Sequence, residues 1–172
     1  MAKGHVILSH GLESGPDATK VTALARVAEA LGWTHERPDY RDLDRRGPLG
    51  DVQVRIERLR ERAALASRPL VLAGSSMGAF ISGEVSRDVP VDGVFLLAPP
   101  TALETWPTPL DAARVPLMVV HGWDDELIPS VDVVRWSHRR KAELRLVDDT
   151  HRLSNHVEYS ASAFADFLTR LP

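Results

Sequence analysis

The chain has 172 residues, a formal net charge of −3, 44% hydrophobic residues and no cysteine. This length predicts a single domain over residues 1–172, with a core large enough to fold without disulfides or metal ions. The nearly balanced charge provides no basic field for nucleic acid or anionic membranes. The lack of cysteine excludes disulfides, cysteine nucleophiles and thiolate metal sites.

The N-terminal residues do not resemble a targeting segment. The stretch MAKGHVILSHG contains one lysine, and its apolar run covers only residues 6–8. Such a run is too short for the core of a signal peptide or for a membrane span. We therefore expect a cytoplasmic protein that does not insert into membranes.

Short apolar runs alternate with amphipathic stretches along the chain, which is typical of βαβ units and a parallel sheet. Runs without polar alternation predict strands that are covered on both faces. These strands are expected at residues 6–8, 70–73, 94–98 and 117–120. Residues 143–147 predict a strand nearer an edge, and residues 34–40 a weaker one. The fold class is therefore α/β, with a mostly parallel sheet of about six strands and helices on both faces.

Apolar residues at helical spacing predict the helices between these strands. The first runs from Val21 to Leu31, with Asp17 available as its N-cap and Gly32 as its C-terminal stop. Further helices are expected over residues 52–66, 79–85 and 157–171, the last of them opened by Asn155. The least regular stretches are residues 41–50 and the proline-rich residues 99–114, which are too few for a lid domain.

The letters GSSMG, directly after a predicted strand, fit the G-x-S-x-G pattern of a nucleophile elbow, where serine lies on a sharp strand-to-helix turn. The positions two before and two after that serine must be nearly free of side chain. Ser76 has Gly74 and Gly78 there, whereas Ser75 would place Met77 at one of them. The pattern therefore selects Ser76, and the N-terminus of the next helix favours an oxyanion beside it. A glycine–serine turn that only ends a strand is the alternative.

A serine nucleophile needs a base and an acid, and in elbow enzymes they follow in the order Ser, Asp or Glu, His. The strand at 117–120 runs into HGWDDELIP, and the strand at 143–147 into DDTH. Parallel strands bring their carboxyl ends to one edge of the sheet, so both loops can converge on Ser76. His151 is the favoured base because it lies in a loop that leaves a strand, and His156 in the last helix is its rival.

The remaining histidines fit other roles. Three of them precede the serine, which breaks the order: His5, His10 and His35. We expect His121, at a strand end, to anchor backbone, and His138 to lie at a solvated helix end.

Four segments in this order resemble the α/β-hydrolase superfamily, and within it the small, lidless bacterial members. They are SHGLESGP, GSSMG, HGWDDELIP and DDTH. The resemblance implies an α/β-hydrolase fold with its acid on Asp125, Asp124 being the one-residue alternative, and its base on His151. It also implies an oxyanion hole formed by the backbone N–H groups of Met77 and Leu12.

The chain departs from the larger members of the family in two ways. The strands that usually precede the loop at His10 are absent, and no cap domain is present, since only residues 99–114 occupy the place of a cap. The resemblance thus implies a minimal sheet and an exposed site. Candidates for lining the substrate pocket are Glu13, Leu103, Trp106 and Trp123, with Glu13 also the second choice for the oxyanion hole.

Together these patterns predict a serine hydrolase that cleaves a carboxylic ester or related small acyl compound through an acyl-enzyme on Ser76. Neither a metal nor an organic cofactor is expected, and the only partner expected is the small-molecule substrate. A catalytically idle binding protein is one alternative; an acyl transferase, peptidase or perhydrolase using the same residues is another. The glycines match neither the dinucleotide-binding nor the P-loop pattern. Substrate identity, acyl-chain preference and oligomeric state stay open.

Overall fold

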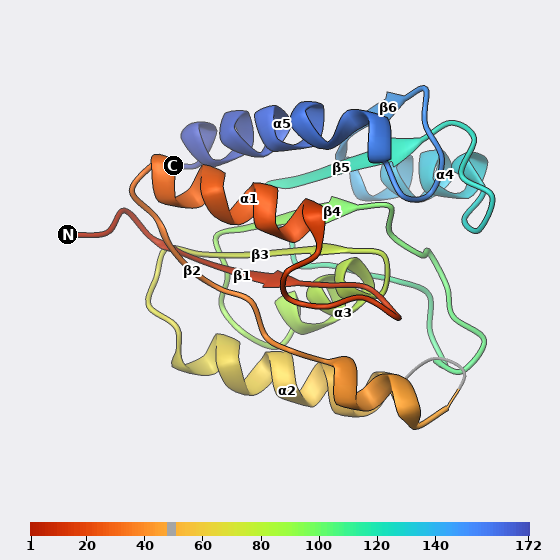
Figure 1. Ribbon diagram of the computed structural model, residues 1–172, viewed down its shortest axis with the longest axis horizontal. Coiled ribbons are helices and arrows are strands. Elements are labelled where there is room, and N and C mark those ends of the chain that lie inside the picture. Colours follow the sequence, from red (N-terminus) through yellow and green to blue (C-terminus); the bar gives the residue numbers. More distant parts are fainter. Residues whose placement is uncertain (48–50) are drawn as a thin grey trace.

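A sheet of six strands, all parallel to their neighbours, forms the centre of the molecule (Figure 1). The computed structural model describes residues 1–47 and 51–172, so the end of the irregular stretch predicted at 41–50 lies outside the described residues. The strands are β1 (His5–Ser9), β2 (Thr34–Glu36), β3 (Leu70–Ser75), β4 (Gly93–Leu97), β5 (Leu117–Gly122) and β6 (Glu143–Val147). Their spatial order is β2-β1-β3-β4-β5-β6. The predicted α/β class is confirmed.

Helices cover both faces of the sheet, as Figure 1 shows. They are α1 (Thr19–Ala30), α2 (Val52–Leu65), α3 (Met77–Ser86), α4 (Ser130–Arg140) and α5 (Val157–Arg170). Short 3₁₀ turns precede α2 and α5, at Arg41–Arg45 and Ser154–His156. Four of the five connections between strands therefore cross over the sheet through a helix, as the alternating sequence pattern predicts, whereas β4 and β5 are joined by a segment without one.

Two hydrophobic cores lie on opposite faces of the sheet because side chains of a strand alternate between its faces. Leu70 and Leu72 of β3 belong to the core under α2, α3 and α4, whereas Val71 and Ala73 belong to the core under α1 and α5. Every residue of β3, β4 and β5 is buried. This two-sided burial is why their sequences show apolar runs without polar alternation.

The N-cap residues of α1 and α5 differ from those expected, although the stop of α1 does not. Gly32 follows α1 with φ at +81°, as predicted for a C-terminal stop. The predicted N-cap Asp17 is wrong: Ala18 holds that position, because its N–H bonds the carbonyl of Gly15 and the chain makes another turn before the helix begins. Asn155 is likewise not the N-cap of α5, which begins after the 3₁₀ turn.

The loops that leave the carboxyl ends of the strands meet at one edge of the sheet. Residues 98–116, between β4 and β5, contain no helix or strand and form no cap. This segment is held to the helices behind it: Nε1 of Trp136 donates to the carbonyl of Leu110 at 2.7 Å, and the Glu84 carboxylate accepts from the N–H of Asp111 at 3.2 Å. The edge is therefore open but ordered.

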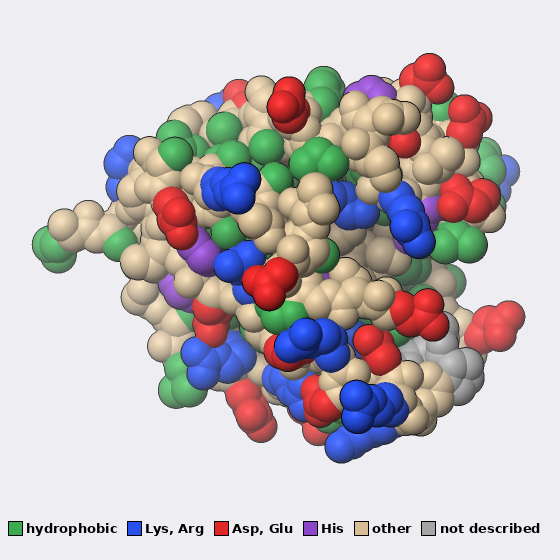
Figure 2. Space-filling view, viewed as in Figure 1, with side chains coloured by type: hydrophobic (Ala, Val, Ile, Leu, Met, Phe, Trp, Pro, Cys, Tyr) green, Lys and Arg blue, Asp and Glu red, His purple; other side chains and the backbone are tan. Residues whose placement is uncertain are grey.

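The outer face of α2 carries charges of both signs, and Figure 2 shows acidic and basic side chains interspersed over it. Three arginines of α2 reach carboxylates on neighbouring elements: Arg58 to Asp42, Arg60 to Asp88 and Arg62 to Glu36. Among the described residues, the helices are too short or too polar to cross a bilayer.

Candidate active site

Ser76 lies on a sharp turn between β3 and α3. Its φ is +56° and its ψ −117°, a conformation that L residues rarely adopt and that only the surrounding structure can hold. The two glycines permit the turn. A Cβ on Gly78 would lie 1.9 Å from the carbonyl oxygen of Ser9, and one on Gly74 would lie 2.2 Å from that of Gly78. No larger residue fits either place, so the turn presents Ser76 and not its neighbour Ser75.

The loop after β1 passes directly beside this turn. A Cβ on Gly11 would approach both the carbonyl of Ser75 and the Cβ of Ser76 at 3.3 Å. Leu12 follows in this loop, and Met77 begins α3, where the first-turn N–H groups have no partner within the helix. The N–H groups predicted for an oxyanion hole thus belong to two segments that meet at Ser76.

Asp125 is held from several sides in the loop after β5. Its Oδ1 accepts from the N–H groups of Leu127 and Ile128 at 2.9 and 2.8 Å, and its side chain is fully buried. Burial alone would raise the pKa of Asp125, but the hydrogen bonds from His151 and these N–H groups outweigh it and bring the pKa below its ordinary value. The carboxylate is therefore ionised at neutral pH.

His151 lies between this carboxylate and the serine. Its Nδ1 is 2.8 Å from Oδ2 of Asp125, and its Nε2 is 3.0 Å from Oγ of Ser76. An ionised carboxylate can only accept, so Nδ1 carries the hydrogen and Nε2 of the neutral ring is free to accept from the serine hydroxyl. One chain of contacts thus joins three residues that are far apart in the sequence. Asp125 lies 49 positions after Ser76, and His151 lies 26 positions after Asp125.

Comparison with known proteins identifies the family of this chain. The family model described as "Alpha/beta hydrolase domain" matches residues 2–166. The chain belongs to this family. No curated protein matches the sequence.

Among solved structures, a protein from Xanthomonas campestris pv. campestris, assigned to the α/β hydrolase superfamily, is 56% identical. The match covers 98% of this chain and 100% of that one, with a TM-score of 0.96. Two more distant structures share the fold. Est1E from Butyrivibrio proteoclasticus is 18% identical over 98% of this chain and 88% of its own, with a TM-score of 0.74. A lidless α/β serine hydrolase from Xanthomonas campestris is 22% identical over 97% and 83%, with a TM-score of 0.68.

Two histidines of this α/β hydrolase anchor backbone near the site. Nε2 of His121 lies 2.9 Å from the carbonyl of Ile128, which confirms its predicted anchoring role, and 3.3 Å from Asp125. The order of residues excludes His10 as the base, and no sequence pattern indicates its partner. Its Nε2 accepts from the N–H of Tyr40 at 2.9 Å, so Nδ1 donates to the carbonyl of Gly11 at 2.8 Å. Burial lowers the pKa of both rings and keeps them neutral.

The other predicted site residues of the hydrolase fall into two groups. Leu12, Leu103 and Trp106 are partly buried and pack against the core that contains Met77. Trp123 is 54% exposed beyond the end of β5. Further predicted residues are also at this edge: Asp124 is exposed, and its N–H bonds the carbonyl of Asp149, while Glu13 has φ at +51°.

The rival base His156 lies in the same loop as His151 but faces another carboxylate. Its Nδ1 is 2.8 Å from Oδ2 of Asp149, which is buried. The structure therefore brings His151, and not His156, to Ser76. The sequence analysis assigns no role to Asp149. A signal for its contact with His156 is present in the sequence, because the two residues are seven positions apart on either side of His151.

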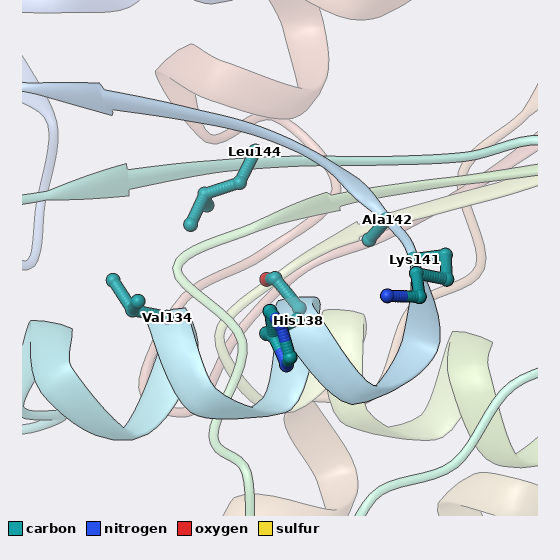
Figure 3. A pocket seen from close by; sticks show the side chains of 6 residues that line it. Val134, His138, Lys141, Ala142 and Leu144 are labelled. Carbon is teal, nitrogen blue, oxygen red and sulfur yellow. The ribbon is translucent and has the colours of Figure 1, made fainter.

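Two surface pockets of the hydrolase lie away from these residues. One is between α4 and β6, where Val134 and Leu144 flank it from the helix and the strand (Figure 3). The other is between α1 and α5, and neither is lined by a predicted site residue. Within residues 1–47 and 51–172, no group of three or more His, Cys, Asp or Glu side chains is arranged to hold a metal ion.

Proposed function

We propose that this α/β hydrolase, as one domain, cleaves carboxylic esters or related small acyl compounds, with Ser76 as nucleophile, His151 as base and Asp125 as orienting acid. One observation carries the proposal: the continuous contacts from Ser76 Oγ to His151 Nε2 and from His151 Nδ1 to Asp125 Oδ2, at 3.0 and 2.8 Å. Serine needs such a base to become nucleophilic, and the base needs such an acid to keep its ring oriented.

In this mechanism Oγ of Ser76 attacks the ester carbonyl while its proton passes to Nε2 of His151. The carbonyl oxygen becomes an oxyanion, stabilised by the N–H groups of Met77 and Leu12. His151 then returns the proton to the leaving alcohol as the C–O bond breaks, which leaves the acyl group on Ser76. Water, deprotonated by the same Nε2, attacks the acyl carbonyl. The bond between the acyl carbon and Oγ then breaks, His151 returns the proton to Ser76, and the acid leaves. Ionised Asp125 stabilises the charged ring in both halves of the reaction.

The surroundings of Ser76 fit a small acyl substrate. Leu103 and Trp106 pack against the core to which Met77 belongs and would provide apolar surface for the acyl group, whereas Glu13 and Trp123 are exposed. Residues 98–116 contain no helix that could close over the site. We infer that short acyl chains are preferred, because an open site offers little surface to bury a long one.

The test is intact-protein mass after treatment with a fluorophosphonate probe. We expect one adduct on the wild type and on Ser75→Ala, no adduct on Ser76→Ala, and labelling slowed about 1,000-fold or more in His151→Ala. Ser75→Ala is the matched control because it removes the adjacent hydroxyl. An unlabelled wild type, or an adduct that persists in Ser76→Ala, would overturn the proposal and favour an idle binding protein.

A further inference from the structure

We infer that Asp149 and His156 form a second aspartate–histidine pair that positions His151, so that both act as positioning residues for the reaction proposed above. The inference rests on that proposed function. Its basis is a set of contacts that do not involve the side chains of Ser76, Asp125 or His151. All of them are made by Asp149, a buried residue at the start of the loop between β6 and α5.

The Asp149 carboxylate closes this loop into a ring. Its Oδ1 accepts from the N–H of Thr150 at 2.7 Å, and its Oδ2 accepts from the N–H of Asn155 at 2.9 Å and from Nδ1 of His156 at 2.8 Å. Residues 149 and 156 are thus tied to each other, and His151 lies inside the ring. Because all three donors converge on one group, the position of that group fixes the curvature of the loop.

The backbone of Asp149 joins the ring to the loop of the proposed acid. Its carbonyl accepts from the N–H of Asp124 at 3.1 Å, one residue before Asp125. A Cβ on Gly122 would lie 2.3 Å from that same carbonyl, so the two loops are in close contact there. Asp149 therefore contacts the segments on both sides of the Asp125–His151 hydrogen bond.

The Asp149 carboxylate is ionised at neutral pH and can therefore accept all three hydrogen bonds. Burial alone would raise the pKa of Asp149, but the hydrogen bonds from His156, Thr150 and Asn155 outweigh it and hold the pKa below its ordinary value. A buried carboxylate needs its donors, since a lost donor leaves a charge uncompensated. Removing the His156 donor is thus expected to move Asp149 and, with it, the loop that carries His151.

Two other features hold the remainder of the loop, so we expect the loop to stay folded when the contact between Asp149 and His156 is lost. Leu153 is fully buried with φ at +51°, and Nζ of Lys20 donates to the carbonyl of Arg152 at 2.8 Å. These contacts maintain the fold of the loop when the pair is broken. The expected result is a small displacement of the His151 ring, which affects catalysis more than folding.

The test compares His156→Phe with His156→Asn. Phenylalanine keeps a ring beside Tyr159, whose centroid is 6.1 Å from that of His156, but donates no hydrogen bond. In asparagine the amide nitrogen Nδ2 is separated from Cα by the same number of bonds as Nδ1 is in histidine. Its N–H can therefore restore the hydrogen bond to Asp149. The matched control is His35→Phe, which removes a histidine–carboxylate contact of 2.8 Å, to Glu29, from the far edge of the sheet.

We expect His156→Phe to lower kcat for p-nitrophenyl acetate and the fluorophosphonate labelling rate by about 10- to 100-fold with KM little changed, as for a misplaced catalytic group. His156→Asn restores most of both rates, His35→Phe changes neither, and in an Asp149→Asn background His156→Phe costs little more. All are measured on protein shown to be folded by circular dichroism. If the phenylalanine variant does not fold, His156→Leu replaces it.

The outcomes separate this inference from the proposed function. Wild type that labels on Ser76, together with His156→Phe that labels equally fast, would overturn the positioning role alone. A loss of rate in His156→Phe that His156→Asn does not restore would also overturn it. An unlabelled wild type would overturn both proposals.

Discussion

The two aspartate–histidine pairs at the carboxyl edge of the sheet have the same contact but different surroundings. In each, a carboxylate oxygen lies 2.8 Å from a histidine Nδ1. Nε2 of His151 faces Ser76, whereas within the described part of the chain no hydrogen-bond partner reaches Nε2 of His156. The comparison teaches that residue type alone does not determine a role here. In the mechanism proposed here, the group beside the other ring nitrogen decides whether a pair takes part in the chemistry or positions another residue.

The most severe test of this comparison replaces the carboxylates one at a time. We expect Asp125→Asn to lower kcat about 10⁴-fold, because an amide can donate to Nδ1 and thereby favours the wrong tautomer of His151. Asp149→Asn is expected to cost only about 10- to 100-fold, since it displaces His151 without changing its partner. Steady-state kinetics on an ester substrate measures both. Equal losses in the two variants would contradict the division of roles.

A second test loosens the loop that the two pairs share. Leu153 is fully buried, so Leu153→Ala is expected to lower the free energy of unfolding by about 2–5 kcal/mol through the lost contacts and the cavity left behind. Leu127→Ala is the control, because Leu127 is 68% exposed and its loss should cost within about 0.5 kcal/mol. Urea unfolding measures both. A stable Leu153→Ala would mean that the two pairs hold the loop without its apolar anchor.

The smallest expected effect is on the pH dependence of stability. The pKa values of Asp125 and Asp149 are both lowered in the folded protein. Their stabilisation is therefore fully present above the ordinary aspartate pKa of about 4 and is lost as pH falls further, because the unfolded chain takes up these protons first. Asp149→Asn should thus show a shallower loss of stability than wild type between about pH 5 and pH 2 in urea unfolding. Parallel curves would contradict it.

The central strands were predictable because burial on both faces requires nearly every residue of the strand to be apolar. Val71 and Leu72 point to opposite cores, so both must be apolar. The weaker strand expected at 34–40 is shorter, Thr34–Glu36, because it is an edge strand with one neighbour and little of it is buried. The elbow was predictable for a similar reason: a turn with Ser76 at +56° leaves space only for Gly74 and Gly78.

Contacts that depend on the path of the chain were not predictable. The N–H of Tyr40 bonds His10 across 30 positions, and nothing near either residue indicates the other. Asp149 and His156 are near in sequence, but Leu153 between them is buried in a left-handed conformation that no local sequence pattern indicates. The assignment of Ser76, Asp125 and His151 as catalytic stays a prediction that labelling and kinetics can test.

The order of the strands has a consequence for synthesis. The inner strand β1 is made first, whereas β6 at the edge is made last, and His151 follows it. A nascent chain that has left the ribosome only as far as α4 contains Ser76 and Asp125 but lacks His151, the proposed base. Since translation proceeds from the N-terminus, unfinished chains are inert toward esters in the mechanism proposed here. Reaction with a fluorophosphonate would then count completed, folded molecules and ignore truncated ones.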